Sequence, residues 1–386
     1  MHRVKLGYEV LLEQQLDMIR GKRVGLVANQ SSVNHNLVHI IDALRAFDVN
    51  IVALFGPEHG VRGDVPAGKE VPSGTDPATG IPIYSLFGPT KKPTPEMLHG
   101  IDVMLFDIQD IGCRFYTFIY TMSYVIQACG QSGIPFIVLD RPNPITGSAV
   151  EGNIPEKGFA SFVGLHPIPI RHGMTAGELA IFFNDQSGFA ADVRVVMCTG
   201  WRRSFWFDET DLHWVLPSPN MPTLDTAAIY PGTCLFEGTN VSEGRGTTKP
   251  FELIGAPWVD AYALAERLND VTLPGVRFRP VFFVPTASKY VHQQCGGVQI
   301  HLTDRSSVQP VLVGLHVLKT LHDMYPEMFQ FLGAGQTEKP FFDLLAGTDK
   351  IRLSIESDKG LGEISNSWND DLGRFIELRK RYLLYF

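Results

Sequence analysis

Val24-Gly25-Leu26-Val27-Ala28 and Asn50-Ile51-Val52-Ala53-Leu54-Phe55 are the stretches that decide the fold. Both are short, continuous apolar runs, the pattern of strands that are buried on both faces of a parallel sheet. Between them, residues 37–47 repeat apolar side chains at the spacing of an amphipathic helix. The order strand, helix, strand predicts a parallel βαβ unit.

The same alternation continues toward the middle of the chain. We expect strands at 102–106, 135–139 and 192–197, and helices at 115–128 and 177–183. The predicted fold class is therefore α/β, with a Rossmann-like doubly wound parallel sheet.

The pattern changes after a stretch rich in Pro, Gly and Asn at 217–257, within which a helix is predicted at 225–236. The expected elements that follow are a helix at 259–268, strands at 276–284 and 297–302, and helices at 308–324 and 371–385. We therefore predict two domains, a Rossmann-like domain at 1–255 and a smaller α/β domain at 256–386.

Composition excludes several function classes. The 386 residues are 44% hydrophobic and 19% charged, with a net charge of −8 and no long run of Lys or Arg, so nucleic acid is not expected as a partner. No apolar stretch is long enough for a membrane span. The N-terminal residues lack the pattern of a signal peptide. The expected compartment is periplasmic or extracellular if a leader has been removed, and otherwise cytoplasmic.

Neither a cofactor nor a metal is expected. No Gly-x-Gly-x-x-Gly follows the first strand, which argues against a dinucleotide. The five cysteines form no Cys-x-x-Cys and are expected to be buried thiols, and the histidines show no ligand spacing.

Polar clusters follow four of the predicted strands. They are Asn29-Gln30, Gly56-Pro57-Glu58-His59-Gly60, Asp107-Ile108-Gln109-Asp110 and Asp140-Arg141-Pro142-Asn143-Pro144. Ligands of doubly wound sheets bind beyond the carboxyl ends of the strands, so we expect the four clusters to share one crevice.

Glu58 is the carboxylate that the pattern favours most for catalysis. Its loop, flanked by Gly56 and Gly60, can hold a carboxyl group in a partly desolvated crevice, as a general acid requires, although the cap of a turn is an equal alternative. Asp107 and Asp110 could cap the helix that follows them. Tyr116 could donate to a leaving oxygen.

Two further segments carry candidate residues. Glu243 and Arg245 lie in the glycine-rich segment, which could fold back over the crevice, whereas Glu237 is expected at a helix end. Arg171-His172-Gly173 is similar to the phosphohistidine motif of histidine phosphatases, but an entry into the helix at Thr175 is the favoured interpretation.

At these residues the chain closely resembles the NamZ-type exo-β-N-acetylmuramidases, glycoside hydrolase family 171. The matching strings are GLVANQ (25–30), FGPEHGVRG (55–63), FDIQDIGCRFYT (106–117), LDRPNP (139–144), RHGMT (171–175), GELA (177–180), PSPNMP (217–222) and NVSEGRGTT (240–248).

The resemblance implies a Rossmann-like domain joined to a smaller α/β domain, with the active site in the cleft between them. It also implies exo-cleavage of the β-1,4 bond after a terminal N-acetylmuramic acid in peptidoglycan fragments, with Glu58 as the catalytic residue. A glycosidase usually needs a second carboxylate, and Glu243, Asp107 and Asp110 are the candidates for it. Tyr116 or the substrate's own N-acetyl group could assist instead. Whether the reaction retains or inverts the anomeric configuration is left open.

Binding roles are expected for polar residues of the same motifs. The substrate-binding candidates are Asn29, Gln30, His59, Arg62, Gln109, Arg114, Asp140, Arg141, Asn143, His172, Asn220, Asn240 and Arg245. Among them Arg62, Arg114 or Arg245 could bind the lactyl carboxylate of muramic acid in a bidentate manner.

Two other functions and the oligomeric state are left open. A phosphatase acting through His172 would hydrolyse phosphate esters, and a non-catalytic cell-wall sugar-binding protein would bind saccharides without forming product. The sequence shows no surface from which a homodimer could be derived.

Overall fold

A seven-stranded sheet forms the larger part of the molecule. The computed structural model describes residues 1–66, 68–335 and 338–386. The strand order is β3-β4-β2-β1-β5-β6-β7, and neighbouring strands are parallel except for β3 and β4. The strands are β1 (Arg23–Ala28), β2 (Asn50–Gly56), β3 (Gly74–Thr75), β4 (Pro82–Ser85), β5 (Val103–Asp107), β6 (Phe136–Leu139) and β7 (Val193–Val196). From β4 to β7 this is the doubly wound order, which confirms the predicted fold class.

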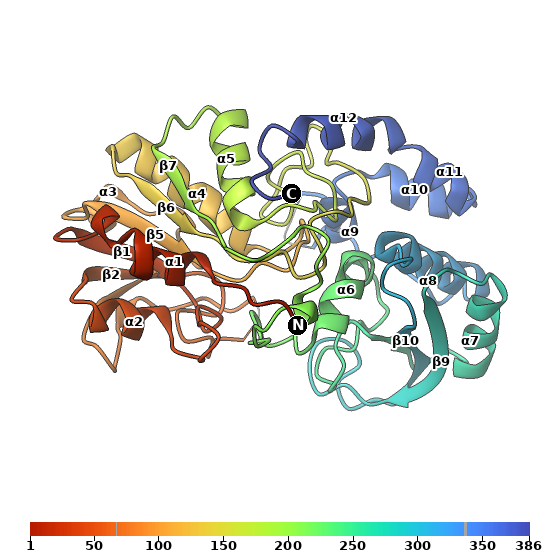
Figure 1. The fold of residues 1–386 in the computed structure, drawn as a ribbon. Helices are drawn as coiled ribbons and strands as arrows, with labels where there is room; N and C mark the ends of the chain where they lie inside the picture. The colour runs from red at the N-terminus through yellow and green to blue at the C-terminus, as the bar shows by residue number, and fades with distance from the viewer. Residues whose placement is uncertain (67, 336–337) are drawn as a thin grey trace.

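Helices cover both faces of this sheet (Figure 1). The cluster on one face joins Leu26 and Leu105 to α1 (Gly7–Gln14) and α2 (Ile40–Ala46). The cluster on the other joins Val27 and Phe106 to α4 (Phe118–Ser132) and α5 (Ala176–Gln186), with α3 (Pro95–Leu98) beside α4. Successive side chains of one strand point to opposite faces, so burial of both faces explains the continuous apolar runs.

A smaller antiparallel sheet lies beside the larger one. Its order is β8-β10-β9, built from β8 (Leu253–Ala256), β9 (Val276–Phe283) and β10 (Cys295–Leu302), with α7 (Ala261–Asp270) packed on it. Next to it, α6 (Leu224–Thr233) packs on α8 (Pro310–Met324), and a Cβ on Gly232 would come within 1.8 Å of the Pro310 carbonyl oxygen. Glycine is therefore required for this close approach of the two helices.

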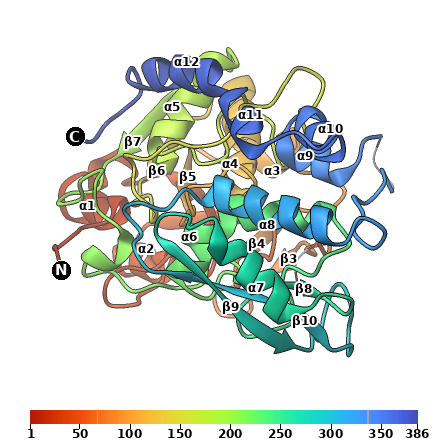
Figure 2. The same cartoon turned by 90° about the vertical axis from the view of Figure 1, so that its right-hand side faces the viewer.

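The last helices lead back to the larger sheet (Figure 2). They are α9 (Phe341–Ala346), α10 (Lys350–Glu356), α11 (Leu361–Asn366) and α12 (Asn369–Arg379). Phe375 of α12 and Tyr382 both pack edge-on against Phe182 of α5, with ring centres 6.0 and 5.1 Å apart.

The predicted helices differ from the observed ones at their ends, most clearly in three cases. The helix expected at 37–47 begins at Ile40, because Leu37 adopts a left-handed φ of 60°. The helix expected at 371–385 ends at Arg379, and Tyr385 beyond it donates a hydrogen bond to Asp140. The helix expected at 225–236 is divided into α6 and the 3₁₀ helix η3 (Cys234–Gly238). Two further 3₁₀ turns are η1 (Leu16–Met18) and η2 (Phe207–Glu209).

All five cysteines are buried, as expected. In the described part of the chain, no helix combines the length and the apolar character that crossing a membrane requires. The described residues also contain no group of three or more His, Cys, Asp or Glu side chains arranged to hold a metal ion.

Candidate active site

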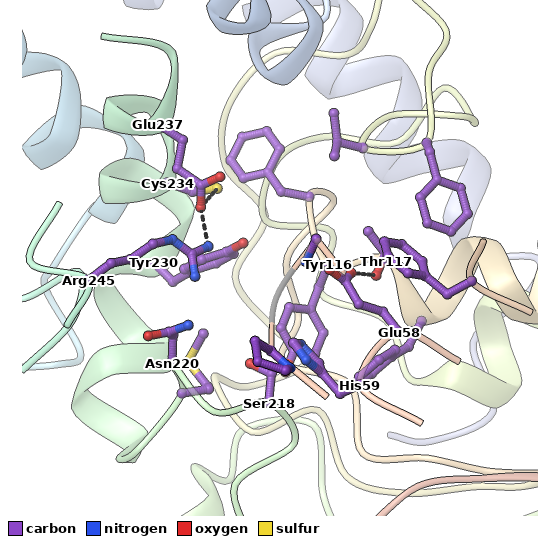
Figure 3. Close-up of a pocket in the computed structure, with 18 of the residues that line it drawn as sticks. Glu58, His59, Tyr116, Thr117, Ser218, Asn220, Tyr230, Cys234, Glu237 and Arg245 are labelled. Carbon is purple, nitrogen blue, oxygen red and sulfur yellow. Dashed lines mark hydrogen bonds and ion pairs between the residues drawn. The ribbon is translucent and has the colours of Figure 1, made fainter. Parts of the chain in front are cut away.

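A cavity of about 680 Å³ lies between the larger sheet and the chain around the smaller one. One wall comes from the loops that follow β2 and β5, and the other from residues 218–221, α6, η3 and the glycine-rich segment (Figure 3). Its volume lies within the range of sites for small ligands. The labelled lining residues are Glu58, His59, Tyr116, Thr117, Ser218, Asn220, Tyr230, Cys234, Glu237 and Arg245.

The loop after β2 fixes Glu58 in the cavity wall. The Gly60 N–H donates to the Pro57 carbonyl at 2.9 Å, and His59 and Gly60 both have left-handed φ values, so the chain turns sharply here. Both carboxylate oxygens of Glu58 accept a hydrogen bond: Oε1 from the Gly68 N–H at 3.0 Å and Oε2 from the Thr117 hydroxyl at 2.8 Å. The carboxyl group is thereby held in one orientation.

Tyr116 supplies a neutral hydroxyl group near Glu58. Its ring packs edge-on against Phe118 and Tyr230, with centres 4.9 and 6.2 Å away. Burial raises the pKa of Tyr116 well above its ordinary value. In the described structure the hydroxyl faces Ser218 without a hydrogen bond of normal geometry. Such a group can donate to an oxygen of a bound sugar.

Glu237 and Arg245 stand together on the opposite side of the cavity from Glu58 (Figure 3). A guanidinium N–H of Arg245 donates to Oε1 of Glu237 at 2.7 Å, and the guanidinium lies 5.0 Å from the ring centre of Phe251. Burial raises the pKa of Glu237, and the charge of Arg245 opposes this effect. The pair thus places a carboxylate in a poorly solvated wall.

Two lysines line the cavity on the Glu58 side. Lys69 follows in the same loop as Glu58, and the Lys91 ammonium lies 4.1 Å from the ring centre of Phe162. Burial lowers the pKa of Lys91, and the nearby Glu58 charge partly offsets this. Within the described residues neither lysine has a carboxylate within ion-pair distance.

The crevice predicted at the carboxyl ends of β1 and β5 is filled. Arg141 donates two hydrogen bonds to Asp107, at 2.5 and 2.9 Å, and both side chains are buried. A buried bidentate pair leaves neither group free for a substrate. The structure thus shows Asp107 and Arg141 bound to each other, and the catalytic role of Asp107 and the substrate contact of Arg141 stay predictions.

Asn29, Gln30 and Gln109 bind neighbouring backbone. The Asn29 and Gln30 amides donate to the Pro217 carbonyl, at 3.3 and 2.8 Å. The Gln109 amide donates to the carbonyls of Asp110 and Pro142. None of the three lines the large cavity, so their predicted substrate contacts are not observed. Asn29 and Gln30 instead hold the segment that carries Ser218 and Asn220.

A second group of predicted residues is buried under the sheet edge. The Asp140 carboxylate accepts hydrogen bonds from the backbone N–H groups of Arg141 and Gly177 and from two hydroxyls, while burial raises its pKa to about 6. Asn143 binds the Met174 carbonyl. Nδ1 of His172 accepts from the Met174 N–H, and Nε2 lies 3.4 Å from Asp110. These residues do not line the cavity, and the fully buried His172 does not support a phosphatase.

Four other predicted site residues bind protein groups outside the cavity lining. Arg62 forms two hydrogen bonds with Asp76, and Arg114 is fully buried among backbone carbonyls. The Asn240 side chain joins its loop to Met328 and Gln330. Glu243 is buried and bound by Lys289 at 2.9 Å, so it holds cations instead of facing the cavity.

The predicted site residues that line the cavity are Glu58, His59, Tyr116, Asn220 and Arg245. Sequence reasoning missed Thr117, although it stands in the quoted 106–117 string, and Glu237, which it placed only at a helix end. Glu237 does belong to η3, and its pairing with Arg245 could not be read from a spacing of eight residues outside a regular helix. Lys69 and Lys91 belong to none of the quoted motifs, so the sequence offered no signal for them.

Comparison with known proteins gives a consistent result. The profile of exo-β-N-acetylmuramidase NamZ, N-terminal, matches residues 24–225, and the C-terminal profile matches 228–385. Peptidoglycan β-N-acetylmuramidase NamZ of Bacillus subtilis (strain 168) is 52% identical over 384 residues, which is 99% of this chain and 92% of that relative. The profiles meet between 225 and 228, and the domain boundary at 255/256 stays a prediction.

Two solved structures of DUF1343 family proteins from Bacteroides fragilis NCTC 9343 share the whole fold. One has a TM-score of 0.91 at 40% identity and covers 100% of this chain and 99% of its own. The other has a TM-score of 0.77 at 32% identity and covers 99% of each chain. The chain therefore belongs to the NamZ family of exo-β-N-acetylmuramidases, a family of glycoside hydrolases.

Proposed function

We propose that this protein hydrolyses the β-1,4 bond that follows an N-acetylmuramic acid at the non-reducing end of peptidoglycan fragments, with Glu58 as the general acid. The observation that carries the proposal is the position of Glu58, whose carboxyl group is held at both oxygens in the wall of the large cavity. The activity of the Bacillus subtilis relative supports the substrate class.

Glu58 protonates the oxygen of the leaving sugar as the glycosidic bond breaks. A general acid must approach that oxygen in a fixed geometry, which the Gly68 N–H and the Thr117 hydroxyl provide. The Thr117 hydroxyl can accept a hydrogen bond from the protonated carboxyl group as well as donate to the ionised one. It therefore holds Glu58 in both states of the cycle.

Cations in the cavity wall distinguish muramic acid from N-acetylglucosamine. Muramic acid carries a lactyl carboxylate, which a cationic side chain recognises through a charge-assisted hydrogen bond. Of the three arginines predicted for this role only Arg245 lines the cavity, and its charge is shared with Glu237 and Glu243. Lys69 and Lys91 face the cavity without such a partner, so we assign recognition of the carboxylate to them.

Turnover of para-nitrophenyl β-N-acetylmuramide, with the β-N-acetylglucosaminide as the control sugar, tests the function. We expect the wild type to cleave the muramide only, and Glu58→Gln to lose turnover of the natural disaccharide. Glu70→Gln is the matched control, because Glu70 is exposed on the same loop and does not line the cavity. Saturable binding of the muramide without product would replace the proposal with a sugar-binding protein.

A further inference from the structure

Only two of the carboxylates on the described residues line the large cavity, Glu58 and Glu237. The expected second groups, Asp107, Asp110 and Glu243, do not line it. Asp107 is bound by Arg141 and Glu243 by Lys289, and one carboxylate oxygen of Asp110 accepts from the Gly112 N–H of its own loop. A glycosidase with two carboxylates places them on either side of the scissile bond. Figure 3 shows Glu58 and Glu237 on opposite sides of the same space.

We propose that Glu237 is the second catalytic carboxylate, the general base that activates the attacking water. This inference rests on the proposed function and extends it to the other side of the sugar ring. Glu237 stands on η3, next to Cys234 and Tyr230, which also line the cavity. A carboxylate on this wall faces the sugar from the side opposite the acid, and its role as a base for water gives the inverting reaction.

The contacts of Glu237 fit a proton acceptor. Arg245 occupies Oε1, and in the described part of the chain Oε2 accepts no hydrogen bond. Burial raises the pKa of Glu237 and so strengthens it as a base, whereas the positive charge of Arg245 favours its ionised form. Arg245 is itself held by Glu243 at 3.4 Å and by the ring of Phe251. One oxygen is thus anchored and the other is available to water.

The proposed step balances in atoms and charge. Oε2 of Glu237 takes a proton from water while the water oxygen forms a bond to the anomeric carbon. The electron pair of the breaking glycosidic bond passes to the leaving oxygen, which takes the proton of Glu58. The product has the α configuration, Glu237 is protonated and Glu58 is ionised, and one proton exchange with solvent restores the starting state.

The first experiment compares two variants on two substrates, para-nitrophenyl β-N-acetylmuramide and a disaccharide with N-acetylmuramic acid at its non-reducing end. We expect Glu237→Gln to lower kcat about 100-fold or more on both, because both need an activated water. Glu58→Gln should lose much more on the disaccharide, because para-nitrophenolate leaves without a proton. Glu266→Gln, exposed on α7, controls for the substitution itself.

A second experiment distinguishes the loss of a general base from a loss of structure or of substrate positioning in the Glu237 variants. Azide attacks without deprotonation, so azide should restore turnover of the aryl muramide to Glu237→Ala and yield an α-muramyl azide. The wild type should release the α anomer first, observed by proton NMR before mutarotation. Release of the β anomer, or Glu237→Gln at wild-type rates, overturns the role of Glu237 while the activity stands. A wild type that cleaves neither substrate overturns the proposed function instead.

Discussion

The hydroxyl of Thr117 donates a hydrogen bond to Oε2 of Glu58 at 2.8 Å, although the two residues lie on loops that follow different strands. Thr117 immediately precedes α4, where a threonine often caps the helix with its side chain. Here its hydroxyl makes no capping hydrogen bond and goes to Glu58 instead. The Thr117 side chain therefore orients the Glu58 carboxyl group instead of capping α4, and Thr117 is a positioning residue for Glu58.

Thr117→Val should lower kcat on the disaccharide about 10- to 100-fold, since a hydrogen bond to a charged group contributes about 1.5–3 kcal/mol. The loss should be smaller on the aryl muramide, whose leaving group needs less help from the acid, and Thr117→Ser should restore most of the activity. Steady-state kinetics on both substrates and a melting curve check this. An equal loss on both substrates together with a lower Tm would point to a structural role.

Lys91→Met should raise KM for the aryl muramide about tenfold and leave kcat nearly unchanged, because the variant loses a cation that faces the cavity. Lys92→Met is a close control, since the Lys92 ammonium binds Gln131 outside the cavity. N-acetylglucosamine, which lacks the lactyl group, should inhibit Lys91→Met and the wild type with the same inhibition constant. A muramide KM equal in both lysine variants would contradict the assignment of the carboxylate to Lys91.

Arg114→Met should destabilise the protein and leave sugar selectivity unchanged. The guanidinium donates to the carbonyls of Asn153, Ile168, Leu345 and Ala346, so it ties α9 to the larger sheet. Removing it leaves buried acceptors unpaired, at a cost of about 3–5 kcal/mol in the free energy of unfolding. Urea denaturation tests the loss of stability, and the ratio of kcat/KM for the two aryl glycosides tests the sugar selectivity. If the variant is as stable as the wild type but no longer prefers the muramide, Arg114 binds the substrate and the prediction is wrong.

The sheet could be predicted from sequence because burial on both faces leaves a direct signal. The runs at 24–28 and 50–55 became β1 and β2 within one residue. Short or polar elements left no such signal: β3 and β4 lie at the sheet edge, and α9 to α11 are helices of six or seven residues. Helix ends such as Arg379 were set by tertiary contacts, here with carbonyls of residues 147, 148 and 173.

The site was predictable only in part, for a physical reason. Polar residues after parallel strands indicate the edge of the sheet at which a ligand can bind. The sequence does not show which of these residues form hydrogen bonds or ion pairs with one another. Asp107 and Arg141 do so completely, and Asn29 binds backbone, so the predicted centre of the crevice is filled. The cavity instead lies beside Glu58, and its far wall comes from Glu237, whose position depends on how η3 packs.

Glu151→Gln should change how stability depends on pH. Glu151 is half-buried, and its Oε1 accepts a hydrogen bond from the Leu312 N–H near the start of α8. Its Oε2 is buried and makes no hydrogen bond among the described residues. Burial raises the pKa of Glu151 to about 7 from 4.5, although backbone hydrogen bonds and Arg171 oppose this. Between these values the folded protein binds a proton that the unfolded chain has released.

The sign follows from this difference in bound protons. The contribution of Glu151 is fully present below pH 4.5 and is lost as the pH rises through about 7, by up to about 3 kcal/mol at about 1.4 kcal/mol per pKa unit. Glutamine keeps the acceptor for Leu312 and cannot ionise. The variant should therefore gain stability relative to the wild type between pH 5 and pH 8, measured by urea denaturation at both values. The same difference at both pH values would show that Glu151 is ionised in the folded protein throughout this range.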